Sequence, residues 1–136
     1  MSRIVLDCSI VMAWCFEDEA NPVADAVLAS LDENEAVVPS LWPLEVANVL
    51  VLGERKGRIT SDATARFLDM LAALPIVVDE QTPQKALREV LALARTYQTT
   101  SYDAAYLELA VREGSPLATL DARLREAAAK LGIALL

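Results

Sequence analysis

Four short, mainly apolar runs recur along the chain, and each is separated from the next by a longer stretch with helical spacing. The runs lie at residues 4–6, 36–38, 76–78 and 116–119. Runs this short predict buried strands. Strands that alternate with helices predict an α/β fold with a mostly parallel sheet covered on both faces.

The connecting stretches carry start and stop signals for helices. Helices are predicted at about 9–16, 22–31, 41–56, 61–74, 82–97, 102–113 and 121–131, and a last strand at 133–135. Ser40 is the predicted cap of the helix at 41–56. No repeat or linker interrupts the pattern, and 136 residues with 54% hydrophobic content suffice for one core. We therefore expect a single domain over residues 1–136.

The charge of the chain restricts its chemistry. A net charge of -8 argues against nucleic-acid binding through a broad basic face. The one compact basic run, Arg55, Lys56 and Arg58, is better explained as a helix C-terminus stabilised by the helix dipole than as an RNA contact. Histidine is absent, so catalysis has to rest on carboxylates, hydroxyls, lysine or cysteine. Oxygen-ligated Mg²⁺ or Mn²⁺ is the expected cofactor.

The cysteines and the N-terminus indicate the compartment. Cys8 and Cys15 are seven residues apart, roughly 10 Å on a helix, which is beyond disulfide reach. Neither a secretory signal nor a stretch of about 20 apolar residues is present. We expect reduced cysteines, a cytoplasmic location and no membrane partner.

Four acidic residues stand at predicted helix starts. Asp7 and Asp121 directly follow strands, so in a parallel sheet both emerge at the same carboxyl edge, where α/β proteins bind ligands. Glu45 lies in line with apolar residues of its helix, and this spacing predicts that it faces the core. Asp103 lies in line with Tyr106 on its own helix. The spacing predicts that the four carboxylates converge.

A structural explanation remains open for each acid taken singly. Asp7 and Asp121 fit N-caps, and Glu45 and Asp103 fit first-turn acids favoured by the helix dipole. Thr100 and Asp103 also fit a capping box. Together, however, like charges at about 5 Å and an effective dielectric near 20 repel by roughly 3 kcal/mol per pair. Protons or a divalent cation must offset that repulsion, and hydrolysis of a phosphodiester is the chemistry that fits.

These motifs resemble the PIN-domain ribonucleases. The resemblance covers Asp7-Cys8-Ser9, Pro39 followed by Glu45, Tyr102-Asp103-Ala104 and Thr119-Leu120-Asp121-x-x-Leu124, in that order over nearly the whole chain. The small size and layout are similar to the VapC-type toxins of toxin–antitoxin pairs.

The resemblance implies a three-layer α/β/α domain and a Mg²⁺- or Mn²⁺-dependent endoribonuclease that acts on RNA. It also implies a homodimer and a cognate antitoxin that covers the active site. Carried over by position, Asp7, Glu45, Asp103 and Asp121 would be the catalytic, metal-binding acids. Ser9 and Thr119 match hydroxyl positions that orient carboxylates or water. Asn48, one turn after Glu45, is a further candidate for this supporting role, although an ordinary polar helix residue explains it equally well.

Two other functions stay open. The first is a phosphatase or phosphotransfer protein with Asp7 as nucleophile, as in haloacid-dehalogenase-like enzymes. Their first strand carries a D-x-D pattern, and Asp7-Cys8-Ser9 lacks the second aspartate. The second is a catalytically silent module of the same fold that acts only by binding a partner protein.

Overall fold

The computed structural model describes residues 2–136, whose strands form one parallel sheet. The strands are β1 (Arg3–Leu6), β2 (Glu35–Val38), β3 (Ile76–Val78) and β4 (Leu117–Ala118), in the order β3-β2-β1-β4. All three strand pairs are parallel, with β1 joined to both β2 and β4. The predicted α/β class is confirmed.

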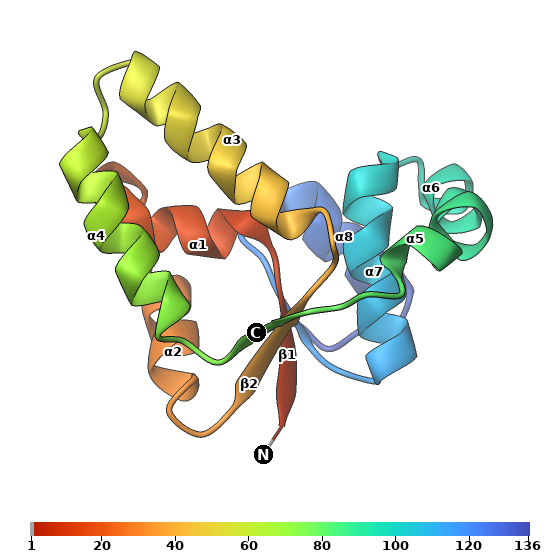
Figure 1. The fold of residues 1–136 in the computed structure, drawn as a ribbon. Helices are drawn as coiled ribbons and strands as arrows, with labels where there is room; N and C mark the ends of the chain where they lie inside the picture. Colours follow the sequence, from red (N-terminus) through yellow and green to blue (C-terminus); the bar gives the residue numbers. More distant parts are fainter. Residues whose placement is uncertain (1) are drawn as a thin grey trace.

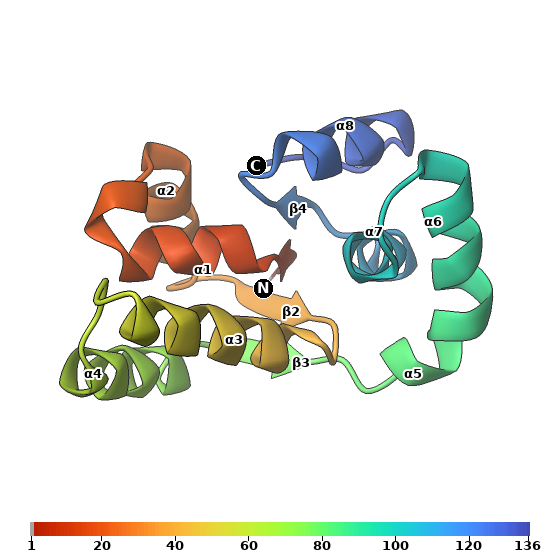
Figure 2. The same ribbon diagram turned by 90° about the horizontal axis from the view of Figure 1, so that it is seen from above.

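Helices cover both faces of this sheet. They are α1 (Cys8–Cys15), η1 (Glu17–Glu19), α2 (Pro22–Ser30), α3 (Trp42–Arg55), α4 (Ser61–Ala72), α5 (Thr82–Lys85), η2 (Ala86–Val90), α6 (Leu91–Tyr97), α7 (Ser101–Glu113) and α8 (Ala122–Lys130). Figure 2 shows α1 to α4 on one side of the sheet and α5 to α7 on the other, with α8 beyond β4. The fold therefore has the three layers that the family resemblance implied.

The core lies where β1 meets α1 and α7. Val5 and Leu6 of β1 are fully buried, as are Ile10 and Val11 of α1. Along α7, every residue from 104 to 110 is buried, because this helix crosses the middle of the sheet and packs on β1 and β4. The burial explains why α7 can hold polar side chains in fixed positions.

Three local predictions were wrong or incomplete. Ser40 does not cap α3: the capping position is Leu41, without a side-chain hydrogen bond, while the Ser40 N–H donates to Thr82 Oγ1 at 3.3 Å. Residues 133–135 form a single bridge, Leu117 to Leu135, instead of a full strand. The helix predicted at 82–97 contains a π-helical segment, η2, between α5 and α6.

A buried ion cluster ties β3 to α7. Arg112 donates two hydrogen bonds of 2.9 Å to the carboxylate of Asp79, which directly follows β3. It donates two more to Glu108, at 2.8 and 3.0 Å. We call Asp79, Glu108 and Arg112 the arginine cluster. Its guanidinium forms ion pairs with two carboxylates at once.

Candidate active site at the carboxyl edge of the sheet

The starts of α1, α3, α7 and α8 gather at the carboxyl end of the sheet, as Figures 1 and 2 show. For α1, α3 and α8 this follows from the parallel topology, because each follows a strand that ends at this edge, whereas α7 follows α6 and leads into β4. The acids at these four helix starts are Asp7, Glu45, Asp103 and Asp121, which we call the acidic edge.

Asp7 is buried and held by four hydrogen bonds. As the N-cap of α1, its Oδ1 accepts from the backbone N–H groups of Ser9 and Ile10 at 3.0 and 3.3 Å, and from the Ser9 hydroxyl at 2.6 Å. Its Oδ2 accepts from the Thr119 hydroxyl. The carboxylate is therefore fixed in one orientation by the polypeptide itself.

The two hydroxyls also join the ends of β1 and β4. Ser9 Oγ accepts from the Leu120 N–H at 2.8 Å, and Thr119 Oγ1 accepts from the Asp121 N–H at 3.1 Å. Ser9 thus donates to Asp7 and accepts from the loop after β4, whereas Thr119 donates to Asp7 across the sheet edge and accepts from an N–H of its own loop. Ser9 and Thr119 both contact Asp7, the first acid of the edge, and their supporting role in catalysis stays a prediction.

Glu45 is held by a residue that the sequence did not single out for this role. The buried Tyr106 of α7 donates its hydroxyl to Glu45 Oε1, which links α7 to α3. Glu45 itself is half-buried. The prediction that it shares the core-facing stripe was wrong, since that stripe consists of Trp42, Val46, Leu50 and Gly53. The neighbouring stripe also contains apolar residues, so periodicity could not choose between the two.

Asp103 and Asp121 differ in how their oxygens are used. Asp121 caps α8, with Oδ1 accepting from the N–H groups of Arg123 and Leu124 at 2.9 and 3.1 Å. At Asp103, only the first half of the capping box forms: its N–H donates to Thr100 Oγ1 at 3.1 Å. Within residues 2–136 the Asp103 carboxylate accepts no hydrogen bond. Its oxygens are available to another ligand.

The acids influence one another electrically. Burial raises the pKa of Glu45, and the charges of Asp7 and Asp103 raise it further, while the Tyr106 hydroxyl opposes the shift. Burial also raises the pKa of Asp103, and the charge of Asp121 adds to it. The pKa of Asp7 is raised by burial despite its hydrogen bonds. The four residues thus form a chain of electrostatic neighbours.

Comparison with known proteins agrees with this geometry. The PIN domain model matches residues 4–130. Ribonuclease VapC3 from Pyrobaculum aerophilum is 30% identical over 124 residues, which are 91% of this chain and 93% of the relative. The chain belongs to the PIN-domain family.

Solved structures of low sequence identity share the fold. The crystal structure of PAE2754 from Pyrobaculum aerophilum superposes with a TM-score of 0.68 at 24% identity, covering 93% of this chain and 87% of that one. VapBC2 from Rickettsia felis, bound to a DNA fragment from the promoter of its components, superposes with a TM-score of 0.63 at 13% identity, covering 98% and 97%. The PIN architecture is therefore retained where most side chains differ.

The donor set of this PIN domain fits a hard divalent cation. All four acids offer carboxylate oxygens, the ligands that Mg²⁺ and Mn²⁺ prefer, and burial together with neighbouring acids raises the pKa of Glu45 and of Asp103. Within residues 2–136, however, no three acidic or cysteine side chains are already placed to hold one ion. A bound cation would have to draw the carboxylates together against their mutual repulsion.

Asn48 and Cys8 lie near the acidic edge but, in the part of the chain that the structure describes, do not contribute to its hydrogen bonds. Asn48 is exposed on α3 and makes no hydrogen bond to the acids within residues 2–136, so its supporting role stays a prediction. Cys8 lies beside the edge, where burial and the charges of Glu45 and Asp7 raise the pKa of its thiol to about 12. The thiol therefore stays protonated and unreactive near neutral pH.

Tyr106 could have been found from the sequence by one signal. It lies three residues after Asp103 on the same helix face. If Asp103 lies close to another acid of the site, the Tyr106 hydroxyl on that face can also reach that acid. Its partner Glu45 is 61 positions away, and no local pattern identifies that pairing.

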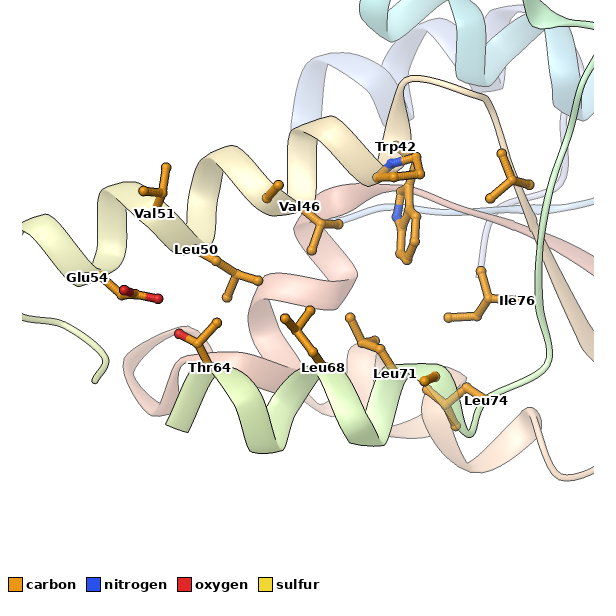
Figure 3. A pocket seen from close by; sticks show the side chains of 14 residues that line it. Trp42, Val46, Leu50, Val51, Glu54, Thr64, Leu68, Leu71, Leu74 and Ile76 are labelled. Atoms are coloured by element: carbon orange, nitrogen blue, oxygen red, sulfur yellow. The ribbon is translucent and has the colours of Figure 1, made fainter. Parts of the chain in front are cut away.

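An apolar groove lies between α3 and α4, and none of the four residues of the acidic edge lines it. Its cavity volume is about 460 Å³, and its walls are mostly apolar, with side chains of α3 pointing toward those of α4 in Figure 3. Glu54 is the one acid on its walls. Trp42 Nε1 and Thr64 Oγ1, both on this groove, are buried without a hydrogen-bond partner. Without converging polar groups, the groove offers no means of hydrolysing a phosphodiester.

Proposed function

We propose that this PIN-domain chain is a metal-dependent endoribonuclease and the toxin of a toxin–antitoxin pair. The proposal includes Asp7, Glu45, Asp103 and Asp121 as the catalytic, metal-binding acids and Mg²⁺ or Mn²⁺ as the cofactor. One observation carries it: four electrostatically coupled acids lie at the carboxyl edge of the sheet, and no Lys or Arg within residues 2–136 forms an ion pair with any of them. The relationship to Ribonuclease VapC3 supports the same conclusion.

A bound divalent cation supplies an activated water and offsets the charge that develops on a phosphate. The polypeptide supplies the placement of the ligands. Ser9 and Thr119 hold the Asp7 carboxylate from both oxygens, and Tyr106 fixes Glu45 from across the site. Asp103 has the least constrained carboxylate and would complete the set of ligands.

Among the proposed partners of the toxin, the antitoxin is the one that suits the negative charge of the acidic edge. RNA is the proposed substrate. The proposed antitoxin covers the acidic edge, and an arginine or lysine from it neutralises the carboxylates. The likeness to VapBC2, a structure of more than one component bound to a DNA fragment from their promoter, supports a protein partner here.

Three further features remain predictions. These are the homodimer, the cytoplasmic location and the single-domain organisation over residues 1–136. No helix within residues 2–136 is long and apolar enough to cross a membrane. The homodimer is checked by the molar mass in solution over a range of concentrations, where a constant monomer mass would reject it.

The phosphatase alternative is less compatible with the geometry of Asp7. A nucleophilic aspartate needs an oxygen free to attack phosphorus, whereas Asp7 is only 6% exposed and both of its oxygens accept hydrogen bonds. The second aspartate of the D-x-D pattern is also missing.

The proposed function is tested by cleavage of single-stranded RNA with and without EDTA. EDTA should abolish cleavage, and added Mn²⁺ or Mg²⁺ should restore it. Asp103→Asn should lower the rate about a hundredfold or more, the scale of losing one charge-stabilising group from an active site. The matched control is Asp69→Asn, because Asp69 is an exposed acid on α4, on another part of the molecule (Figure 1).

Cleavage that survives EDTA would reject the metal dependence. Equal activity in Asp103→Asn and Asp69→Asn would reject the assignment of the acidic edge. An inactive wild type that still binds a partner protein would favour the silent binding module.

A further inference from the structure

A polar cleft opens beside Asp103, between the α6–α7 turn and α8. Its cavity volume is about 630 Å³. Figure 2 shows the turn next to α8, on the side of the molecule away from α4. The wall on the turn comes from residues 97–100, and the wall on α8 from Arg123, Glu126, Ala127 and Lys130. Because Asp103 also lines it, the cleft begins at the acidic edge.

The α8 wall presents one helix face with a cation at each end. Arg123, Glu126 and Lys130 lie at i, i+3 and i+7, so their side chains share a face. The two cations are separated by roughly 10 Å along the helix axis. Lys130 makes only an exposed contact of 3.5 Å with Glu126, and such pairs are weak. Both positive groups are available to an anionic ligand.

Arg123 differs in its position from the other cations that are unpaired in the described part of the chain, because it lines the cleft beside Asp103. Arg3, Arg58 and Arg112 are engaged in ion pairs, and Arg125 donates to the carbonyls of Thr119 and Leu136. Within residues 2–136, Arg123 has no carboxylate partner, although it lies two residues from Asp121. It also occupies the first turn of α8, where the helix dipole disfavours a positive charge. Neither an ion pair nor the helix dipole therefore accounts for a cation at this place.

The opposite wall suits a nucleotide. Tyr97 contributes a half-buried aromatic ring, and Gln98 and Thr99 contribute polar groups. Gln98 has φ of 54°, the one positive φ outside glycine within residues 2–136, at a helix end where glycine or asparagine is usual. An aromatic ring and polar groups that face cations across a groove are the arrangement that binds single-stranded nucleic acid.

We propose that this cleft binds the stretch of single-stranded RNA next to the scissile phosphate, with Arg123 contacting the backbone. The inference rests on the proposed ribonuclease function and adds the route by which RNA approaches a protein of net charge -8. Lys130 contacts the backbone further along, and Tyr97 stacks against a base.

The test compares Arg123→Gln with Arg66→Gln. Arg66 is exposed on α4, has no ion pair within residues 2–136 and is remote from the cleft (Figure 2), so both variants change the net charge equally. Binding of a short, fluorescently labelled single-stranded RNA of mixed sequence is measured in EDTA over a range of salt. Arg123→Gln should weaken binding about tenfold and reduce the salt slope by about 0.7, the value for one phosphate contact on a single strand. Arg66→Gln should leave both unchanged.

Two further readouts separate this inference from the proposed function and from misfolding. The melting temperature of Arg123→Gln should not fall, because a cation is removed from a helix N-terminus. In the cleavage assay with Mn²⁺, KM should rise with little change in kcat.

Equal RNA binding by the two variants, or no binding by wild type, would reject the proposal that the cleft binds RNA, even if the wild type cleaves RNA. A selective loss in Arg123→Gln from a protein that never cleaves RNA would support the cleft and reject the ribonuclease.

Discussion

The arginine cluster and the acidic edge both contain neighbouring carboxylates, but they differ in whether a cation pairs with them. In the arginine cluster, Asp79 and Glu108 share the guanidinium of Arg112 through four hydrogen bonds of 2.8 to 3.0 Å. At the acidic edge, hydroxyls and backbone N–H groups hold Asp7 and Asp121, and a phenol holds Glu45. One cluster contains its cation, and the other has none within residues 2–136.

The pKa shifts follow this difference. The Arg112 guanidinium lowers the pKa of Asp79, whereas burial and neighbouring acids raise the pKa of Glu45 and Asp103. The fold is thus able to provide a pair of acids with a shared cation and does so beside β3. At the carboxyl edge it leaves the charge without a counterion, which is the arrangement expected of a site whose cation comes from solution.

The largest expected effect on stability comes from removing the cation of the arginine cluster. Arg112→Gln leaves two mostly buried carboxylates without their positive partner, and breaking a buried pair in this way costs about 3–5 kcal/mol of unfolding free energy. Denaturant unfolding measures the loss. The double variant with Glu108→Gln should recover part of it, because one of the two unpaired charges is also removed. A loss below about 1 kcal/mol would show that the cluster contributes little to the fold.

A smaller effect is expected from the hydroxyls that hold Asp7. Thr119→Val removes the donor to Asp7 Oδ2 and the acceptor of the Asp121 N–H in a fully buried position, so about 1–3 kcal/mol should be lost. Ser9→Ala should cost less, because Asp7 Oδ1 keeps two backbone donors. Thermal unfolding of both variants measures the difference, and a larger loss in Ser9→Ala would contradict this account.

The two clusters should respond to pH with opposite signs in metal-free protein. The lowered pKa of Asp79 means that its stabilisation is present above its ordinary value of 3.8 and is lost as pH falls through the lowered value. The raised pKa of Asp103 means that stability is present below 3.8 and is lost as pH rises through the raised value.

Melting temperatures in EDTA over a range of pH test these signs. Asp79→Asn should reduce the loss of stability in acid. Asp103→Asn should reduce the loss that develops as pH rises from about 4 toward neutrality. If both variants flatten the same side of the pH profile, the assigned signs are wrong.

The smallest effect on stability is expected from Tyr106→Phe, which keeps the ring and removes only the hydroxyl that binds Glu45. Stability should change by about 1 kcal/mol or less. Because the Tyr106 hydroxyl lowers the pKa of Glu45, its removal should move the acid limb of the RNA-cleavage profile to higher pH. An unchanged profile would show that Tyr106 has only a packing role.

Local sequence signals predicted much of this molecule. The strands 4–6, 36–38 and 76–78 and the capping roles of Asp7 and Asp121 follow from apolar runs and helix-start patterns, which act within a few residues. The same signals placed Asp7 and Asp121 at one edge of the sheet, because a parallel topology fixes where strands end.

The rest depends on contacts between distant segments. The donation from Ser40 to Thr82 spans 42 positions, and the bond from Tyr106 to Glu45 spans 61. Arg112 meets Asp79 across 33 positions, so the sequence could not separate a neutralised acid from one left without a cation. These pairings are set by how helices pack on the sheet, which periodicity does not encode.

The central claim, that the acidic edge is built for an external divalent cation, is tested most directly by melting temperature against Mn²⁺ concentration. Wild-type protein in EDTA should gain stability with added Mn²⁺ in proportion to RT ln(1 + [Mn²⁺]/Kd), about 2.7 kcal/mol at a hundredfold excess over Kd. Asp103→Asn should melt at or above wild type in EDTA and gain much less from Mn²⁺, while Asp69→Asn should respond as wild type does. A wild-type protein that gains no stability from Mn²⁺, or an Asp103→Asn variant that gains as much, would contradict the account.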